Sequence, residues 1–385
     1  MEAARKYLED SVAALTGQSP ELAELLDLFE RRLWHNLTTQ LLELVNHPHL
    51  KESPQLIPLY TDFIKHFESK INQLSFVHII LAISKAYRDP VETIKFLEGV
   101  ATKVSGAEGS PDAYLLVRSV IAQLKLQDPK NREETKELLE SIQTGLDGVA
   151  GIDTSVYANY YKAQAIYHKA AGLSAEFYRN ALLYLSYTAI ESLSEQERLQ
   201  MAFDLGISAL VGEDIYSFGD LLAHPIVDSL LGTQGEWLHH LLHAFNKGDI
   251  HTYEQLVAKY EQQLASQPIL VQHVDRMKEK ISILCLIELI FARQAIDRSV
   301  PLSAIAETTK VGLDMVELLV MKALSLKLLK GKIDQLNQTF NVTWVQSRVL
   351  SLDHIKKMRD NLQDWTKKVN QTSLYIEQGT PEPVI

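Results

Sequence analysis

The chain has 385 residues, 46% of them apolar, and its 38 basic and 49 acidic residues leave a formal net charge of −11. This length is enough for several domains or for one extended repeat array. The negative charge disfavours nucleic-acid binding as the main function. The single cysteine, Cys285, rules out an intramolecular disulfide and fits a reducing compartment.

The N-terminal segment Met1 to Gln18 mixes acidic residues with short apolar pieces, so it lacks the sections of a signal peptide. The longest apolar run, Ile281 to Ala292, is interrupted by Ser282 and Glu288. It is also shorter than the roughly 20 residues that a membrane-spanning helix needs. We therefore expect a buried helix there and no membrane association.

The first two thirds of the chain show the apolar spacing of amphipathic helices, beginning with Leu22 to Leu37. Three later helices are predicted to start where a capping residue precedes proline, since proline is tolerated in the first helical turn. These starts are Asp89-Pro90, Ser110-Pro111 and Asp128-Pro129. Helices of this length with short connections are typical of stacked helical hairpins.

Tyr157 to Gly172, followed by Ala175 to Leu185, resembles one degenerate tetratricopeptide hairpin, with Gly172 ending the first helix. Such hairpins bury their apolar faces by stacking on neighbours. The sequence thus predicts a mainly α protein that begins with an α-solenoid, whose concave face is a candidate binding surface.

A winged helix is predicted from Pro301 to Gln346. Two helical patterns come first, and the second has its core stripe on Val316, Leu319, Val320, Ala323 and Leu324. The period then changes from 3.6 to 2, because Phe340, Val342 and Trp344 alternate with more polar residues. Residues 330–334 can pair with that run across a loop at 335–338.

A DNA-reading winged helix needs Arg, Lys, Asn or Gln aimed at base edges on its second helix. Here the residues off the core stripe include Asp314, Glu317, Leu318 and Met321. Carboxylates repel phosphate, and the apolar pair suits a protein partner, although cover by another helix of the same chain explains it equally well. The predicted partner-binding residues of the winged helix are Leu318, Met321, Phe340, Val342 and Trp344.

The C-terminal helix has a narrow apolar seam with alternating steps of three and four residues, which Leu352 extends upstream. Its predicted partner-binding residues are Ile355, Met358, Leu362, Trp365 and Val369. Packing back onto its own domain is the alternative, but a surface helix usually has a wider stripe, so we favour a bundle with partner chains. Gly379 to Ile385, with two prolines, is predicted to be a disordered tail.

We find no catalytic constellation. His239 and His243 share a helical face as a zinc pair would, but His240 occupies the position of the general base and no third ligand is evident. Glycine-rich phosphate loops and nucleophile elbows are missing from the sequence as well. We therefore predict no enzyme activity, no cofactor and no metal site.

The segment LLHAFNKGD, Leu241 to Asp249, resembles the helical hallmark of the PCI domain, named for proteasome, signalosome and initiation factor. Further segments are similar to PCI subunits of the lid of the 26S proteasome regulatory particle, so the resemblance covers nearly the full length. These segments are residues 33–38, 218–225, 317–324, 330–334 and 343–350.

This resemblance implies a non-catalytic scaffold subunit, needed for assembly of the lid and so for ATP-dependent degradation of ubiquitinated proteins. It also implies a hetero-oligomer that occurs in the cytoplasm and nucleus. Other PCI subunits would bind this chain through winged-helix edges and through a C-terminal helix bundle. The N-terminal array is a candidate site for a ubiquitin receptor. The alternatives are a PCI subunit of the cullin-deconjugating signalosome or of a translation initiation complex and, less favoured, a DNA-binding winged-helix protein.

The expected domains are N-terminal helical repeats (1–172), the helical part of a PCI domain (173–298), a winged helix (299–350), a C-terminal bundle helix (351–376) and a flexible tail (377–385).

Overall fold

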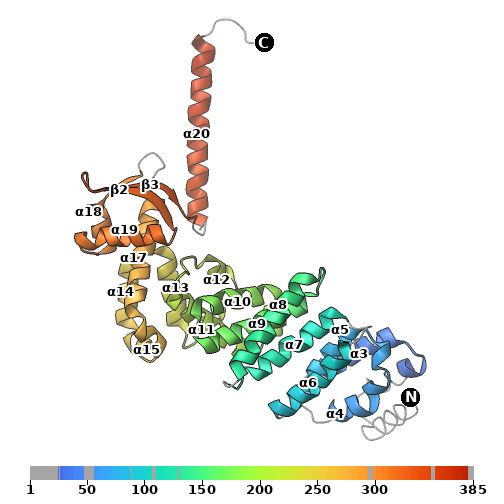
Figure 1. Cartoon of the computed structure of the whole chain (residues 1–385). Helices are drawn as coiled ribbons and strands as arrows, with labels where there is room; N and C mark the ends of the chain where they lie inside the picture. The colour runs from blue at the N-terminus through green and yellow to red at the C-terminus, as the bar shows by residue number, and fades with distance from the viewer. Residues whose placement is uncertain are drawn as a thin grey trace. The chain divides into compact units, whose positions relative to one another are not determined.

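The computed structural model describes residues 25, 27–46, 56–87, 89–105, 110–128, 131–293, 298–347 and 352–379. Helices dominate these residues, and their strands form one small sheet (Figure 1). The mainly α architecture predicted from the sequence is therefore confirmed. The chain divides into two compact units, residues 1–201 and 202–385.

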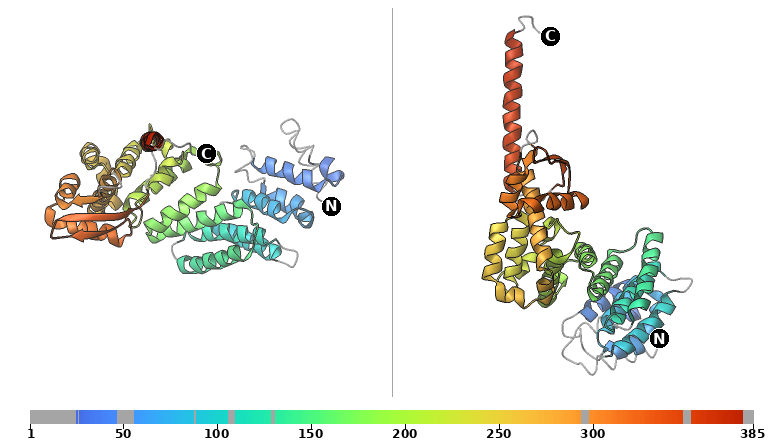
Figure 2. Two further views of the ribbon diagram at one scale, coloured as in Figure 1. Left: turned by 90° about the horizontal axis from the view of Figure 1, so that it is seen from above. Right: turned by 60° about the vertical axis from the view of Figure 1, so that its left-hand side comes forward.

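Unit 1 is a stack of helices. They are α3 (Trp34–Asn46), α4 (Leu56–Pro58), η1 (Leu59–Phe63), η2 (Ile64–His66), η3 (Glu68–Lys70), α5 (Gln73–Ser84), α6 (Pro90–Val104), α7 (Pro111–Lys125), α8 (Arg132–Gly148), α9 (Thr154–Ala171), α10 (Ser174–Tyr187) and η5 (Ile190–Ser192). Packing is largely sequential: α3 contacts α5, α6 contacts α7, α7 contacts α8 and α9, and α9 contacts α10. Figure 2 shows this stack from two further sides.

Several predicted helix ends are confirmed. Helices α6 and α7 begin at Pro90 and Pro111, whereas Pro129 lies outside the described residues. Gly172 ends α9 in the left-handed conformation, at φ 76°. The boundary expected at residues 172/173 lies inside the α9–α10 hairpin, whose two helices pack along each other, so unit 1 continues beyond it.

One predicted helix is interrupted. Within the segment expected to be helical from Leu22 to Leu37, the chain turns at Arg32, which has a φ of 58°, and α3 starts afresh at Trp34. Leu33, expected on the apolar face, is consequently 44% exposed. The turn lets the Trp34 ring stack on Phe67, with 5.8 Å between the ring centroids. Leu22 itself lies outside the described residues.

Unit 2 starts within α11 and continues through a second group of helices. They are α11 (Glu195–Val211), α12 (Gly219–Ala223), η6 (Val227–Leu230), α13 (Glu236–Lys247), α14 (Ile250–Lys259), α15 (Glu261–Ala265), α16 (Pro268–Gln272) and α17 (Val274–Phe291). Helix α17 contacts α13 and α14 and also the winged-helix elements that follow it in the chain. Its residues Ile281 and Ile290 are buried, as predicted for this run. Of the helices described, none combines the length and apolarity that crossing a membrane demands.

The winged helix has the predicted order of two helices followed by a hairpin. Its elements are β1 (Ser299–Pro301), α18 (Leu302–Thr309), α19 (Leu313–Ser325), β2 (Leu329–Asp334) and β3 (Thr339–Val345). The strand order is β1-β3-β2, all antiparallel, so β1 and β2 form the two edges. Strand β1 was not predicted, because three residues carry too little alternation to be recognised.

The pairing of β2 with β3 contains a bulge. Gly331 pairs with Val342 and Lys330 pairs with Trp344, so Thr343 is the extra residue on β3. A bulge of this kind disturbs the alternation of side chains between the two faces of a strand. Phe340 and Val342 face the core. Trp344 was predicted to share their face, but it does not and is 43% exposed.

The final helix, α20 (Leu352–Gly379), runs three residues past the predicted end of the C-terminal helix. Each side chain described on α20 is exposed. The side chain of Leu352 and the predicted tail beyond Gly379 lie outside the described residues.

Candidate partner-binding surfaces

Helix α19 separates its core from an exposed apolar face. Val316 and Val320 are fully buried in the winged-helix core, whereas Leu318 and Met321 are 54% and 55% exposed. Among the described residues no further helix covers this pair, which the sequence left open. Met315 is exposed to a similar extent and lies one turn before Leu318, although the sequence analysis did not select it. We call Met315, Leu318 and Met321 the α19 surface.

Two of the charges around the α19 surface are engaged within the chain. Glu317 accepts a hydrogen bond of 2.7 Å from the amide of Gln335 in the hairpin loop. Lys322 forms an ion pair with Glu279 of α17. A helix with Asp314 and Glu317 at its start, and a paired lysine near its end, lacks the donors and the positive field of a DNA-reading helix.

The strand residues predicted to bind partners fall into two groups. Phe340 and Val342 are 0% and 6% exposed and belong to the winged-helix core, so the surface prediction is not supported for them. Trp344 remains available, and the ammonium of Lys330 lies 5.2 Å from the centre of its ring. An exposed indole beneath a cation is a side chain suited to an interface.

Helix α20 presents its predicted seam to solvent. Leu362 is 60% exposed, Trp365 is 66% exposed, and Ile355, Met358 and Val369 are also exposed. Seven residues after Val369, Ile376 continues the seam by a further heptad and is also exposed. We call these six residues the α20 seam. Burying one such side chain completely stabilises a structure by about 1.5–3 kcal/mol.

The PCI-like segment forms the turn between α13 and α14. Gly248 ends α13 in the left-handed conformation, and its N–H donates to the carbonyls of Ala244 and Phe245. Asp249 then caps α14, because its Oδ1 accepts from the Thr252 N–H at 3.2 Å and its Oδ2 from the Thr252 hydroxyl at 2.6 Å. The motif therefore has a structural reason: it reverses the chain between two packed helices.

The three histidines of α13 are not grouped with each other as three ligands of a metal ion. The ring centroids of His239 and His243 are 4.5 Å apart, and burial lowers the pKa of both side chains. His240 instead contacts Glu236 at 3.4 Å. Across the described ranges, no three His, Cys, Asp or Glu side chains come together in a way that could hold a metal ion.

Sequence reasoning missed one buried charge. Lys280 of α17 is 2% exposed, and its Nζ donates to the carbonyls of Ala209 at 2.6 Å and Gly212 at 2.9 Å. These carbonyls lie at the C-terminal end of α11, where a cation interacts favourably with the helix dipole. Burial nevertheless lowers the pKa of Lys280 to about 7. Lysine within an amphipathic helix is normally exposed, so no sequence signal set it apart.

Stacked helical hairpins followed by a winged helix with exposed apolar surfaces define a PCI-type helical-repeat scaffold. A family model described as PSD13 N-terminal repeats matches residues 21–242, and one described as PCI domain matches residues 257–344. Both fit the order of elements described above.

Known relatives match over almost the whole chain. Identity is 44% to the 26S proteasome non-ATPase regulatory subunit 13 homolog B of Arabidopsis thaliana, across 99% of both chains. It is 38% to the 26S proteasome non-ATPase regulatory subunit 13 of Dictyostelium discoideum, across 98% of both, and 34% to the 26S proteasome regulatory subunit RPN9 of Saccharomyces cerevisiae, across 93% of both. The chain belongs to the family of 26S proteasome non-ATPase regulatory subunit 13.

Proposed function

We propose that this chain is a non-catalytic structural subunit of the 26S proteasome regulatory particle. In that role it is needed for assembly of the lid, and hence for ATP-dependent degradation of ubiquitinated proteins. The observation that carries the proposal is the 44% identity to a named proteasome regulatory subunit over 99% of both chains. That extent includes both the helical repeats and the winged helix, so the similarity is not confined to a shared domain.

The winged helix is the first proposed contact with other PCI subunits. Strands β1 and β2 are sheet edges, and an edge strand has unpaired N–H and C=O groups that another chain can bind. The α19 surface and Trp344 add exposed apolar area in the same small domain. An apolar centre with charged residues around it is the usual composition of a protein interface.

The α20 seam is the second proposed contact. Its residues follow the a/d positions of a heptad repeat, and each is about half exposed or more. Helices with this pattern are stabilised when other helices cover the seam in a bundle. Partner helices from other lid subunits would supply that cover.

The remaining parts of the proposal concern the N-terminal repeats and the location in the cell. The repeats, residues 1–172, would hold a neighbouring subunit, for which a ubiquitin receptor is our candidate. As a proteasome subunit the chain would occur in the cytoplasm and the nucleus. Its contribution would be architectural, in keeping with the words non-ATPase regulatory subunit in the names of its relatives.

Affinity purification of the tagged full-length chain from cells tests the proposal. We expect proteasome ATPases and lid subunits to be recovered together. Recovery of signalosome subunits or initiation factors without proteasome ATPases would overturn it. A parallel titration with duplex DNA should show no tight, salt-dependent binding, since that behaviour would favour a DNA-binding winged helix.

A further inference from the structure

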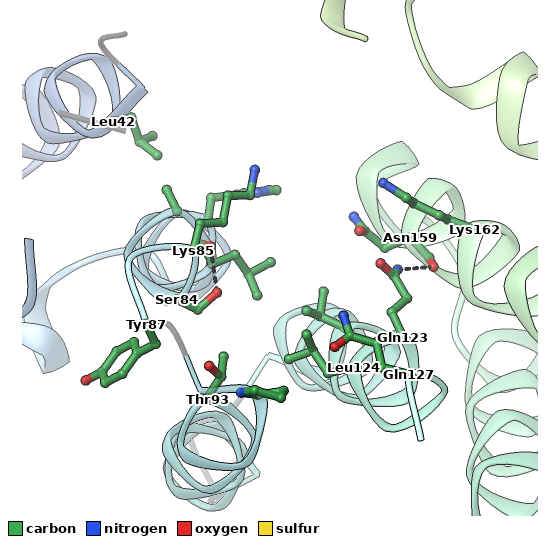
Figure 3. Close-up of a pocket in the computed structure, with 15 residues that line it drawn as sticks. Leu42, Ser84, Lys85, Tyr87, Thr93, Gln123, Leu124, Gln127, Asn159 and Lys162 are labelled. Carbon is green, nitrogen blue, oxygen red and sulfur yellow. Dashed lines mark hydrogen bonds between the residues drawn. The ribbon is translucent and has the colours of Figure 1, made fainter. Parts of the chain in front are cut away.

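A cavity of about 690 Å³ opens between the helices of unit 1 (Figure 3). It is lined by residues of α3, α5, α6, α7 and α9, so five helices far apart in sequence contribute to one space. Its volume lies within the range of sites that hold a ligand or a short segment of chain. We call it the N-terminal cavity.

The charge of the N-terminal cavity is opposite to that of the whole chain. Among the described residues that line it are two lysines, Lys85 and Lys162, and no aspartate or glutamate, although the chain has 49 acidic residues. His78 also lines it, but burial lowers the pKa of this imidazole, which favours the neutral form. The lining residues themselves therefore carry two positive charges, and the carboxylate that both lysines influence, Glu197, does not belong to the lining.

The two lysines act on the same region of space. Figure 3 shows Lys85 and Lys162 extending toward one another from opposite sides of the cavity. Hydrogen bonds from Ser194 are the main cause that lowers the pKa of Glu197, and the charges of Lys162 and Lys85 lower it further. A carboxylate can thus be influenced by both ammonium groups at once. A concave surface with one sign of charge concentrates ions of the opposite sign.

Side-chain amides also line the N-terminal cavity. The Gln123 amide donates to the backbone carbonyl of Asn159 at 2.8 Å, and the Asn159 amide donates to the carbonyl of Ser155 at 2.9 Å. Both hydrogen bonds use the NH₂ groups of Gln123 and Asn159 and so orient the two amides. The side-chain oxygen of each residue is an acceptor of the kind that binds a peptide N–H. Leu81 and Leu124 supply an apolar floor.

These features favour a peptide over a nucleic acid. A nucleic-acid strand is bound through many cations and through aromatic rings on which its bases stack. The cavity has two lysines, and Tyr87 in its lining already packs on Phe96, with 5.3 Å between the ring centroids. An extended peptide needs fewer groups: amides for its backbone, a floor for one apolar side chain and cations for its carboxylates.

We propose that the N-terminal cavity binds an extended segment of a partner protein that carries aspartate or glutamate side chains, which Lys85 and Lys162 recognise. The lining residues lie between residues 42 and 162, within the N-terminal repeats for which a neighbouring subunit is proposed above. This inference deepens that part of the proposed function and does not depend on the winged-helix and α20 contacts.

A fluorescence-anisotropy titration of the full-length chain tests the proposal. The probe is a short amidated peptide of alternating leucine and glutamate with a fluorescein label, and the comparison peptide has glutamine in place of glutamate. We expect saturable binding of the glutamate peptide that weakens with added salt. The double variant Lys85→Glu, Lys162→Glu should bind it at least about tenfold more weakly, because two charge-assisted contacts become repulsive.

A matched control separates this effect from the change in net charge. Lys95→Glu with Lys136→Glu alters the charge equally at exposed positions of α6 and α8 that do not line the cavity, and it should bind as the unmodified chain does. Circular dichroism and the unfolding midpoint verify that each variant is folded. If the reversal variant does not fold, Lys85→Gln with Lys162→Gln replaces it, with the same expected direction.

Several results would overturn the proposal. Equal binding of the glutamate and glutamine peptides would remove the role of charge. An equal loss in the control variant would remove the role of the two lysines, and absence of binding would remove the site. Tighter binding of a single-stranded oligonucleotide that displaces the peptide would assign the cavity to nucleic acid.

Discussion

The backbone oxygen of Leu284 lies 2.9 Å from the position that a Cβ atom on Gly248 would occupy. Gly248 also has a φ of 66°, which costs a residue with a side chain about 1–2 kcal/mol. Gly248→Ala should therefore destabilise the chain by about 2–4 kcal/mol, since strain and a backbone contact add. The measurement is the free energy of unfolding from a denaturant titration.

Gly172→Ala is the matched control for that prediction. Gly172 has a similar φ of 76°, but a Cβ there would meet no atom within 4 Å. Only the backbone strain should then appear, at about 1–2 kcal/mol. An equal loss of stability in the two variants would mean that the close approach of α17 to Gly248 has no energetic consequence.

Lys280 makes stability depend on pH in a defined range. Its pKa in the folded chain is about 7, against an ordinary value of 10.5, because burial disfavours the charged form. Between these values the unfolded chain holds a proton that the folded chain has released, so unfolding takes up a proton. Stability should rise with pH from about 7 to about 10, by at most about 1.4 kcal/mol per pH unit from this group.

Denaturant titrations of Lys280→Met at several pH values test this origin. The variant should show a flatter dependence on pH over that range, because it has no group to titrate at this position. Lys278→Met removes an exposed lysine from the same helix and should retain the slope of the unmodified chain. Parallel curves for both variants would show that other groups cause the pH dependence.

The α20 seam should be dispensable for folding and necessary for assembly. Leu362→Asp with Trp365→Asp places two charges on exposed positions, so the unfolding midpoint of the isolated chain should change little. In cells the same variant should be lost from purified proteasome complexes, because a charged seam cannot be buried between helices. Sedimentation of cell extracts, followed by detection of the tagged chain, measures this.

Gln363→Asp with Asn370→Asp is the control for the seam, since both residues lie at b positions of the heptad, outside the a/d seam. It should enter complexes normally. Unfolding of the isolated chain by the seam variant would instead show that the seam packs internally.

The α19 surface gives an independent test of lateral contacts. Leu318→Asp with Met321→Asp should leave the isolated chain folded and reduce its recovery with other lid subunits. Leu319→Asp, one position away, places a carboxylate at a site that is only 8% exposed and should destabilise folding itself. Normal incorporation of the Leu318, Met321 variant would exclude this face from the interface.

The bulge in β3 predicts losses of stability of different size for two aromatic residues. Phe340→Ala removes a fully buried ring and should cost about 3–5 kcal/mol of folding free energy. Trp344→Ala changes a half-exposed ring and should cost less than about 1 kcal/mol. Similar losses at both positions would contradict the assignment of Trp344 to the surface.

The parts of the fold that the sequence predicts correctly are those with strong local signals. Pro90 and Pro111 begin helices, Gly172 ends one, and the change of period before Phe340 identifies the hairpin. The apolar spacing from Ile355 to Val369 could also be found in the sequence, because a seven-residue repeat needs no knowledge of the rest of the fold. Its extension to Ile376 was missed, and its role in partner binding stays a prediction.

The failures arise where contacts distant in sequence decide the local geometry. The turn at Arg32 is stabilised by the packing of Trp34 on Phe67, more than thirty residues away. The bulge that exposes Trp344 depends on the register with β2. Lys280 is buried because α11 ends beside it, which no spacing within α17 can indicate.

The exposure of the α20 seam also affects the fate of any copy that is made in excess. Contiguous uncovered apolar side chains favour self-association and recognition by chaperones. A chain without a partner is therefore more prone to self-association and chaperone binding than a chain with one, because binding removes the α20 seam from solvent. If partner helices cover α20 as proposed, the amount of this subunit that persists in a cell would follow the supply of those partners, whatever its own rate of synthesis.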